Sequence, residues 1–238
     1  MKKWVIPDLH GCSKTLRVLI EDRIQPSRSD QMYFLGDYID RGPDPKGVID
    51  YVMNLQSNGY QVFPLKGNHE EYLLLAHQKE RELQKQFFLF RKRNRFFDEW
   101  MQHGGRDTIN SFGVKKITAL PDKYLAWISG LNNYLIVDNY VIVHAGFNFE
   151  IRDPFEDTHS MLWIRGFTIV PEKINNLKLI HGHVPVSLEF IRNTISNRNH
   201  KFIPLDNGCY LPGKPGMGNL TALELNSMEL IVQPNIES

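Results

Sequence analysis

Short apolar runs and helical stripes alternate along the first third of the chain. The runs cover residues 4–6, 32–35 and 60–65, which is the length of buried strands. One helical pattern between them begins at Ser13, which can cap it, and another begins at Asp44-Pro45, a helix cap followed by a first-turn proline. This order of strand, helix, strand, helix and strand predicts a parallel sheet with right-handed crossovers.

Helical and then strand-like patterns fill the rest of the chain. Helical spacing follows Glu70 to about Asn94, and Pro121 opens another helix. The stretch "NYLIVDNYVIVHAG" predicts a hairpin that turns at Asp138-Asn139, and "LKLIHGH", "KFIPLDNG" and "LTALEL…MELIVQ" predict further strands, the last pair turning near Asn226-Ser227. We expect one α/β domain over residues 1–238, with two packed mixed sheets flanked by helices and a helical segment at 71–113.

Composition and charge narrow the classes of function. Of the 238 residues, 42% are hydrophobic and 23% are charged, which is typical of a globular protein. The net charge of +1 gives no field that would favour nucleic acid or a membrane surface as a partner. Two cysteines form no disulfide framework, and neither a signal-peptide core nor a membrane-spanning run is present in the sequence. We expect a cytoplasmic protein.

Polar motifs follow five of the predicted strands. They are "PDLHG", "GDYIDRG", "KGNHE", "VIVHAG" and "LIHGHVP". Ligands of open α/β sheets bind beyond the carboxyl ends of the strands, so these motifs can face one crevice. Carboxylates at the end of a buried strand are costly unless they are paired, and a mixture of oxygen and imidazole ligands suits Mn²⁺, Fe or Zn²⁺ rather than Ca²⁺ alone. The sequence therefore predicts a metal site.

Each motif alone has an ordinary explanation. A lone histidine is usually a core or surface residue, and Asn68 in "GNHE" could simply cap a helix. Five such motifs in order, each ending a strand, favour the metal site. For His181 we favour an ordinary strand-end histidine over a residue that supports a ligand. For His103 a substrate contact and a plain loop position remain equally open.

The set of motifs resembles the phosphoprotein phosphatase family of calcineurin-like metallophosphoesterases. The resemblance extends from Asp8 to about Leu225, and "WMQHGGRDTINSFG" and "PLDNGCY…LTALEL" are similar to its bacterial serine/threonine phosphatase branch. Pro7 replaces a usual glycine, and Val184 stands where threonine is common. The related symmetrical diadenosine tetraphosphate hydrolases lack an acid at position 40 and carry "GNHD", so Asp40 and Glu70 favour the protein phosphatase branch.

The resemblance implies a calcineurin-like sandwich with two divalent metal ions bridged by Asp37. The first ion would be held by Asp8, His10 and Asp37, and the second by Asp37, Asn68, His144 and His183. Substrate phosphate would be bound by Arg41, Arg165 and Asn68. His69 would protonate the leaving group, and Asp40 would orient His69 and favour its charged form. Mn²⁺ is the metal we expect on reconstitution, with Fe or Zn²⁺ as alternatives.

The implied reaction is hydrolysis of phosphoserine or phosphothreonine in proteins by direct attack of a metal-bound hydroxide. The alternatives are a symmetrical diadenosine tetraphosphate hydrolase or another small-phosphoester hydrolase, and, less favoured, a non-catalytic phosphate-binding module. The partner is then a phosphoprotein or a small phosphoester, with no membrane; nucleic acid is not favoured as a partner, and the sequence leaves the oligomeric state open. The basic and aromatic stretch at 79–95 could be a substrate lid, but we favour an amphipathic helix.

Overall fold

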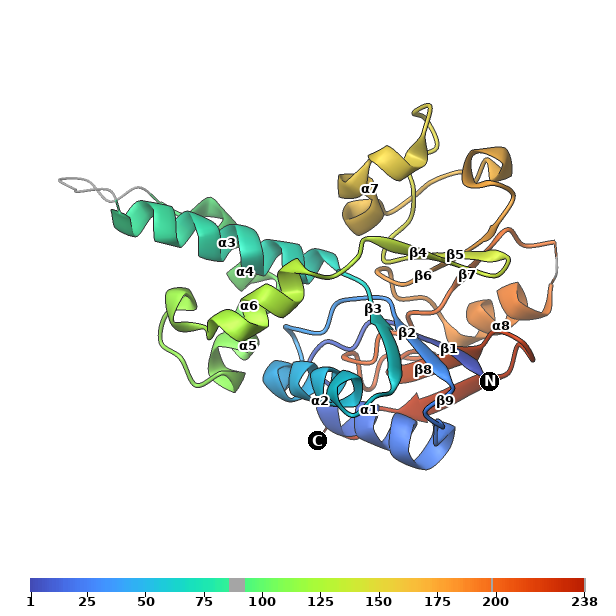
Figure 1. The fold of residues 1–238 in the computed structure, drawn as a ribbon, viewed down its shortest axis with the longest axis horizontal. Helices are drawn as coiled ribbons and strands as arrows, with labels where there is room; N and C mark the ends of the chain where they lie inside the picture. Colours follow the sequence, from blue (N-terminus) through green and yellow to red (C-terminus); the bar gives the residue numbers. More distant parts are fainter. Residues whose placement is uncertain (86–92, 198, 238) are drawn as a thin grey trace.

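Two β-sheets packed face to face form the centre of the protein in this computed structural model, which describes residues 1–85, 93–197 and 199–237 (Figure 1). The five-stranded sheet has the order β3-β2-β1-β8-β9, and the four-stranded sheet has the order β4-β5-β6-β7. Both sheets are mixed. The strands are β1 (Lys3–Ile6), β2 (Gln31–Phe34), β3 (Gln61–Pro64), β4 (Tyr134–Val137), β5 (Tyr140–Val143), β6 (Lys178–His181), β7 (Phe202–Pro204), β8 (Asn219–Glu224) and β9 (Leu230–Pro234).

Alternation of side chains along the strands produces three apolar layers. Trp4 and Ile6 of β1 face the layer beneath the helices, whereas Val5 faces the layer between the sheets. Ile142 of β5 lies in that same middle layer, and Val141 lies in the outer layer of the four-stranded sheet. Both faces of each sheet are covered, which explains why these strands read as continuous apolar runs.

Helices cover the outer faces and extend to one side of the sandwich. In Figure 1, α1 and α2 lie along the five-stranded sheet, α3 to α6 gather at one side, and α7 lies on the side of the four-stranded sheet. The helices are α1 (Ser13–Val18), α2 (Pro45–Ser57), α3 (Asn68–Lys85), α4 (Arg95–Gln102), α5 (Gly105–Ser111), α6 (Asp122–Ser129), α7 (Thr158–Trp163) and α8 (Leu188–Ser196). A π-helical turn η1 (Leu19–Ile24) continues α1, and the 3₁₀ turns are η2 (Ile117–Ala119), η3 (Pro154–Glu156) and η4 (Pro171–Ile174).

Several predicted boundaries are confirmed. The Asp44 carboxylate caps α2 by accepting from the Gly47 N–H at 2.9 Å. The β4–β5 hairpin turns where expected, with Val137 paired to Tyr140 and Asp138 in the left-handed region at φ 52°. Antiparallel pairing of β8 with β9 likewise confirms the last predicted pair of strands.

One predicted helix cap is wrong, and one predicted helix end falls short of its expected place. Ser13 does not cap α1; Cys12 occupies the cap position, and the Ser13 hydroxyl donates to Asp44 at 2.7 Å. The helical pattern after Glu70 does not continue through Asn94, which has extended dihedrals and caps α4 by accepting from the Phe97 N–H. In both cases a polar side chain finds a tertiary or capping partner that helical spacing alone does not reveal.

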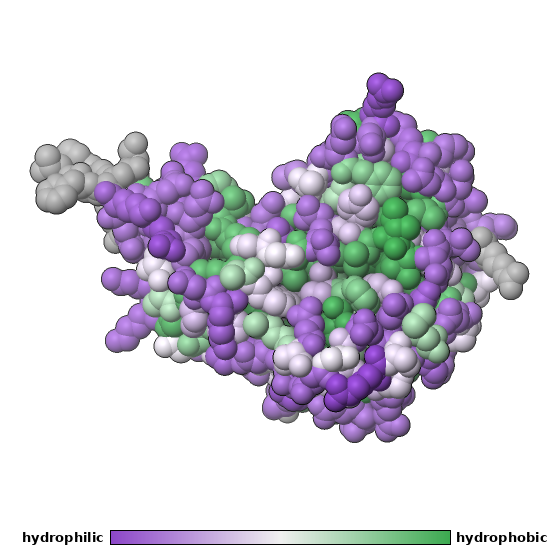
Figure 2. All heavy atoms as spheres, viewed as in Figure 1, coloured by the Kyte–Doolittle hydropathy of each residue, from purple (hydrophilic) through white to green (hydrophobic). Residues whose placement is uncertain are grey.

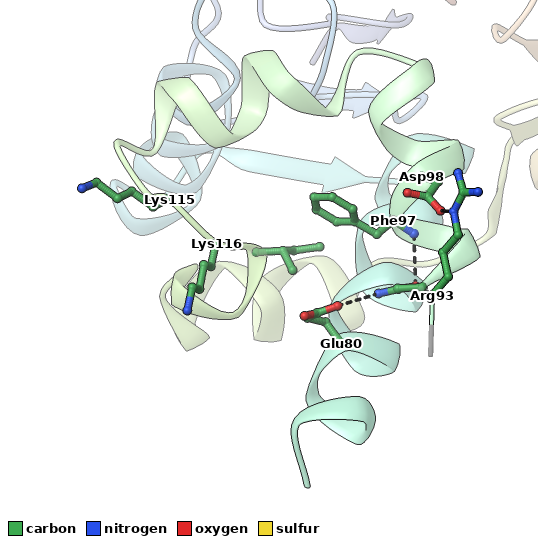
Figure 3. Close-up of a pocket in the computed structure, with 8 residues that line it drawn as sticks. Glu80, Arg93, Phe97, Asp98, Lys115 and Lys116 are labelled. Carbon is green, nitrogen blue, oxygen red and sulfur yellow. Dashed lines mark hydrogen bonds and ion pairs between the residues drawn. The ribbon is translucent and has the colours of Figure 1, made fainter. Parts of the chain in front are cut away.

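The basic and aromatic stretch borders a cavity of about 340 Å³ between α3, α4 and η2 (Figure 3). The lining includes three basic side chains, those of Arg93, Lys115 and Lys116. Arg93 forms an ion pair with Asp98. Residues 86–92, including the phenylalanines of the predicted amphipathic helix, lie outside the described residues. The choice between a lid and a helix at that place therefore stays a prediction.

The visible face of the protein is hollowed between the side that carries α3 to α6 and the part that carries α7 (Figure 2). Hydrophobic and hydrophilic residues both line this hollow. Within the described ranges, no helix has both the length and the apolar character needed to cross a lipid bilayer.

Replacing Ile142 by alanine should destabilise the protein by about 2–5 kcal/mol, because a fully buried side chain between the sheets would leave a cavity. Ile136→Ala on the same hairpin, where the side chain is 52% exposed, is the matched control and should cost less than about 0.5 kcal/mol. Chemical denaturation of both variants measures the difference, and equal losses would contradict the assigned packing.

Candidate metal centre and active site

The five polar motifs converge at one edge of the sandwich, as the sequence predicts. Asp8 follows β1, Asp37 follows β2, Asn68 follows β3, His144 follows β5 and His183 follows β6. Each predicted metal ligand is buried, none more than 7% exposed: Asp8, His10, Asp37, Asn68, His144 and His183.

The second predicted ligand set is brought into mutual contact. His144 Nε2 lies 2.9 Å from Asn68 Oδ1 and 3.2 Å from His183 Nδ1. The distance from His183 Nδ1 to Asn68 Oδ1 is also 2.9 Å. Asp37 Oδ2 lies 3.5 Å from His144 Nε2, and Asp37, His144 and His183 satisfy the spacing of a metal site.

The first predicted ligand set is brought together in part. His10 Nε2 lies 3.4 Å from Asp37 Oδ2, on the side of the carboxylate that also faces His69 Nε2 at 4.0 Å. These three residues form the other group with metal-site spacing. Asp8 stands beside this group, and its carboxylate accepts from the His183 N–H at 3.1 and 3.0 Å. Asp37 is common to both groups, which is the position of a bridging ligand.

The protonation of the histidines fits metal binding. His10 Nδ1 lies 2.9 Å from the Ile39 carbonyl, and His144 Nδ1 lies 2.9 Å from the Leu35 carbonyl. A carbonyl only accepts, so each Nδ1 donates and each Nε2 offers a lone pair to the centre. Burial lowers the pKa of His144 to about 3, and that of His183 also to about 3, so both rings are neutral at pH 7. Neutral imidazoles and carboxylates form a donor set that suits divalent transition metals.

The backbone of the site is strained and held in place by Glu70. His10, Asp37 and His183 have φ of 42°, 51° and 69°. Such left-handed non-glycine residues each cost on the order of 1–3 kcal/mol and cluster at functional sites. Glu70 accepts from the N–H groups of Asp37, Tyr38 and Gly67, each at 2.9 Å. This carboxylate therefore fixes the loop that carries the bridging ligand.

Two glycines permit the close approach of these loops. Gly36 has φ +106°, and a Cβ there would lie 2.5 Å from the Gly67 nitrogen. At Gly182 a Cβ would lie 2.1 Å from Asp8 Oδ1. Any larger residue at either position would force two ligand loops apart.

Asp40 orients His69, as predicted, through a 2.7 Å contact between Oδ2 and Nδ1. Asp40 itself is fixed by Trp100 Nε1, at 2.9 Å, and by the Thr108 hydroxyl, at 2.5 Å. The burial of the ring opposes the charged form that was expected for His69. Burial lowers its pKa to about 4, although the Asp37 charge acts in the opposite direction.

Both predicted phosphate-binding arginines lie beside this centre. Arg41 Nη1 is 2.8 Å from His10 Nε2, and its guanidinium lies 4.4 Å from the ring centre of Tyr210. Arg165 is exposed, and its charge lowers the pKa of both His69 and His183 after the larger effect of burial. The two arginines therefore place positive charge where a phosphate would approach the cluster.

The two histidines for which the sequence allowed alternative roles lie in different places. His181 is buried at the end of β6 near Phe167 and Phe202, with ring centres 5.6 and 5.9 Å away, as favoured; its Nε2 nevertheless has no partner among the described residues. The ring of His103 lies 6.4 Å from that of His69 and is partly exposed. Both predictions for His103 remain compatible with that place.

Sequence reasoning assigned no site role to Trp100, Thr108 or Asp206. The first two hold Asp40, and Asp206 is a buried acid beside Asp8. Each lies in a stretch already singled out by resemblance, "WMQHGGRDTINSFG" or "PLDNGCY". That signal marked the stretches as important without revealing which side chain each one contributes.

Comparison with known proteins places the fold and the site in a family. The sequence profile of the calcineurin-like phosphoesterases matches residues 1–221, which include every predicted ligand. The chain belongs to this family. Calcineurin-like phosphoesterases depend on two metal ions, in agreement with the two ligand groups that share Asp37.

Individual relatives are more distant. The chain is 29% identical over 101 residues to a symmetrical bis(5'-nucleosyl)-tetraphosphatase of Buchnera aphidicola, covering 42% of this chain and 33% of that protein. For the enzyme of the same name from Nitrosospira multiformis the identity is 27% over 148 residues, covering 61% and 44%. The match thus spans less than half of each relative. A serine/threonine phosphatase of Saccharomyces cerevisiae shares the fold, with a TM-score of 0.66 at 14% identity over 100% of this chain and 81% of that one.

Asp37→Ala should weaken the binding of both metal ions and abolish activity, because a bridging carboxylate serves two ions. The metal content of purified protein, measured by elemental analysis after reconstitution with Mn²⁺, should fall from two ions per chain. The exposed acid Asp22 provides the control, since Asp22→Ala should retain both ions. Two tightly bound ions in Asp37→Ala would refute the bridge.

The metal-free protein should lose stability as the pH rises from ~7.5 to ~8.5. Burial raises the pKa of Glu70 to about 8 and that of Asp206 to about 7, so the folded chain binds more protons than the unfolded chain until the pH passes these values. The buried histidines have lowered pKa values, and histidine in the unfolded chain is largely neutral above pH ~7.5, so they add little slope in this window.

Chemical denaturation in a chelator, at steps of pH, measures this loss. Saturating Mn²⁺ should flatten the dependence, because bound cations favour the ionised carboxylates. A slope that is the same with and without Mn²⁺ would contradict a role for the acids in metal binding.

Proposed function

We propose that the protein is a two-metal phosphatase that acts on phosphomonoesters with an alkoxide leaving group, the chemistry of phosphoserine and phosphothreonine in proteins. The observation that supports this most is the Asp40–His69 contact at 2.7 Å. An alkoxide is a poor leaving group and needs a proton as the bond to phosphorus breaks. A positioned general acid supplies about 10²–10⁴-fold in rate.

The remaining groups have compatible roles. Two bound divalent ions would provide positive charge for the phosphate and lower the pKa of water. Arg41 and Arg165 would bind phosphate oxygens through their planar guanidinium groups. The phosphate dianion brings negative charge next to His69, which favours a proton on the ring despite its burial. Asp40 keeps Nδ1 as a donor, so that the exchangeable proton resides on Nε2.

A second candidate is hydrolysis of dinucleoside polyphosphates. The names of the curated relatives favour it, and so does a row of aromatic rings at the edge of the site. Tyr72 and Trp163 have ring centres 4.5 Å apart, and His103 stacks on Tyr72 at 5.3 Å. Partly exposed aromatic rings are suitable surfaces for nucleobases. The phosphate leaving group of such a substrate requires no general acid.

A substrate comparison separates the two candidates. The Mn²⁺-reconstituted protein would be assayed with a phosphoserine peptide, p-nitrophenyl phosphate and diadenosine tetraphosphate. We expect the highest kcat/KM for the peptide. A clear preference for diadenosine tetraphosphate would establish the second candidate instead.

His69→Asn should lower activity unevenly. Turnover of the phosphoserine peptide should fall by about 10²–10⁴-fold, whereas turnover of p-nitrophenyl phosphate should fall by less than ~10-fold, because p-nitrophenolate leaves without a proton. His200 follows α8 and contacts Asn193 of that helix, so it offers a matched control, and His200→Asn should change neither rate. Equal losses on both substrates would show that His69 does not protonate the leaving group.

A further inference from the structure

Asp206 lies at the same edge of the sandwich as the metal ligands. It follows β7, which pairs in parallel with β6, the strand that leads to His183. The side chain is 1% exposed. Four residues further on, the ring of Tyr210 contacts the ring of His10 at 4.6 Å. The loop after β7 therefore covers the first predicted metal site.

One oxygen of this buried carboxylate lacks a partner. Oδ1 accepts from the Gly208 N–H at 2.7 Å, whereas Oδ2 is buried and has no hydrogen-bond partner among the described residues. Asp8 lies next to it through the loop after β6: the His183 N–H of that loop donates to the Asp8 carboxylate, and its Val186 N–H donates to the Asp206 carbonyl. Two buried carboxylates in neighbouring loops, one with a bare oxygen, are neutralised either by a proton or by a bound cation.

The protein itself offers little positive charge for this purpose. Arg41 is the cation whose charge acts on Asp206, but its guanidinium is directed to His10 Nε2 and lies over the Tyr210 ring. No ion pair between Arg41 and Asp206 is present in the part of the chain that the structure describes. A metal ion between the two acids would satisfy both of them.

We propose that Asp206 binds, through Oδ2, the metal ion held by Asp8 and His10. The first site then offers the carboxylates of Asp8, Asp37 and Asp206 and one imidazole. The second site offers one carboxylate, one amide oxygen and two imidazoles. Carboxylates suit Mn²⁺ or Mg²⁺, whereas imidazole suits Zn²⁺, Fe and Cu²⁺. The two sites therefore differ in metal preference, and Mn²⁺ belongs in the first.

Asp206→Asn tests the charge, because the amide oxygen still accepts from Gly208. Equilibrium dialysis against Mn²⁺ would measure both affinities without any assay of catalysis. We expect one Mn²⁺ to bind as in wild type and the other to bind at least ~10-fold more weakly. Asp30, a buried acid at the amino end of β2, provides the control, and Asp30→Asn should leave both affinities unchanged. Unchanged affinities in Asp206→Asn would overturn the proposal.

Asp206→Cys tests direct ligation. A thiolate prefers a soft ion, so Cd²⁺ should bind more tightly than in wild type and give an additional thiolate-to-metal absorption in the ultraviolet. The wild-type protein, which carries the same Cys12 and Cys209, supplies the background. Denaturation of the metal-free variants tests their folding. Folded Asp206→Cys with no absorption beyond that of wild type would overturn direct ligation.

Discussion

Buried negative charge at the ends of the strands is the constraint on which the rest of the site depends. Asp40 and Glu70 are satisfied by hydrogen bonds from Trp100, Thr108 and the backbone. Asp8 and Asp37 also accept backbone N–H bonds, but they lie close enough for each charge to oppose the other. Burying such charges costs several kcal/mol per ion without compensation. Divalent cations are the compensation that this arrangement requires.

The same constraint explains the backbone. Loops that bring acids and histidines to within 3–4 Å of one another cannot relax into ordinary dihedrals, and Asp37, Asp40 and Arg41 all have positive φ. Burial of apolar side chains in the three layers of the sandwich stabilises the fold enough to compensate for this strain. Glu70 fixes the position of the bridging ligand, because its hydrogen bonds join the loop after β2 to the start of α3.

The sequence predicted the sandwich and its ligand motifs because strand alternation and strand-end chemistry are local signals. Side-chain contacts between residues far apart in the chain could not be predicted in this way. Asp40 meets Trp100 and Thr108 at 60 and 68 residues' distance in the chain, and Ser13 donates to Asp44 rather than capping its own helix. The prediction of a charged His69 meets a related difficulty. The neighbouring Asp40 suggests a charged ring, but burial by the whole fold has the larger effect on the pKa of His69.

Under the proposed function, phosphate recognition and substrate choice would occupy different layers of this site. The ligands, Asp40 and His69 are buried and contact at most the phosphate and the leaving oxygen. Arg165 is exposed, and Tyr72 and Trp163 are only partly buried. Whatever is attached to the phosphate must therefore meet this outer layer, where single substitutions alter contacts without disturbing the metals. Under that proposal, one buried centre would serve a substrate that carries either a protein side chain or a nucleoside, and the outer aromatic layer together with the need for a general acid would decide between them.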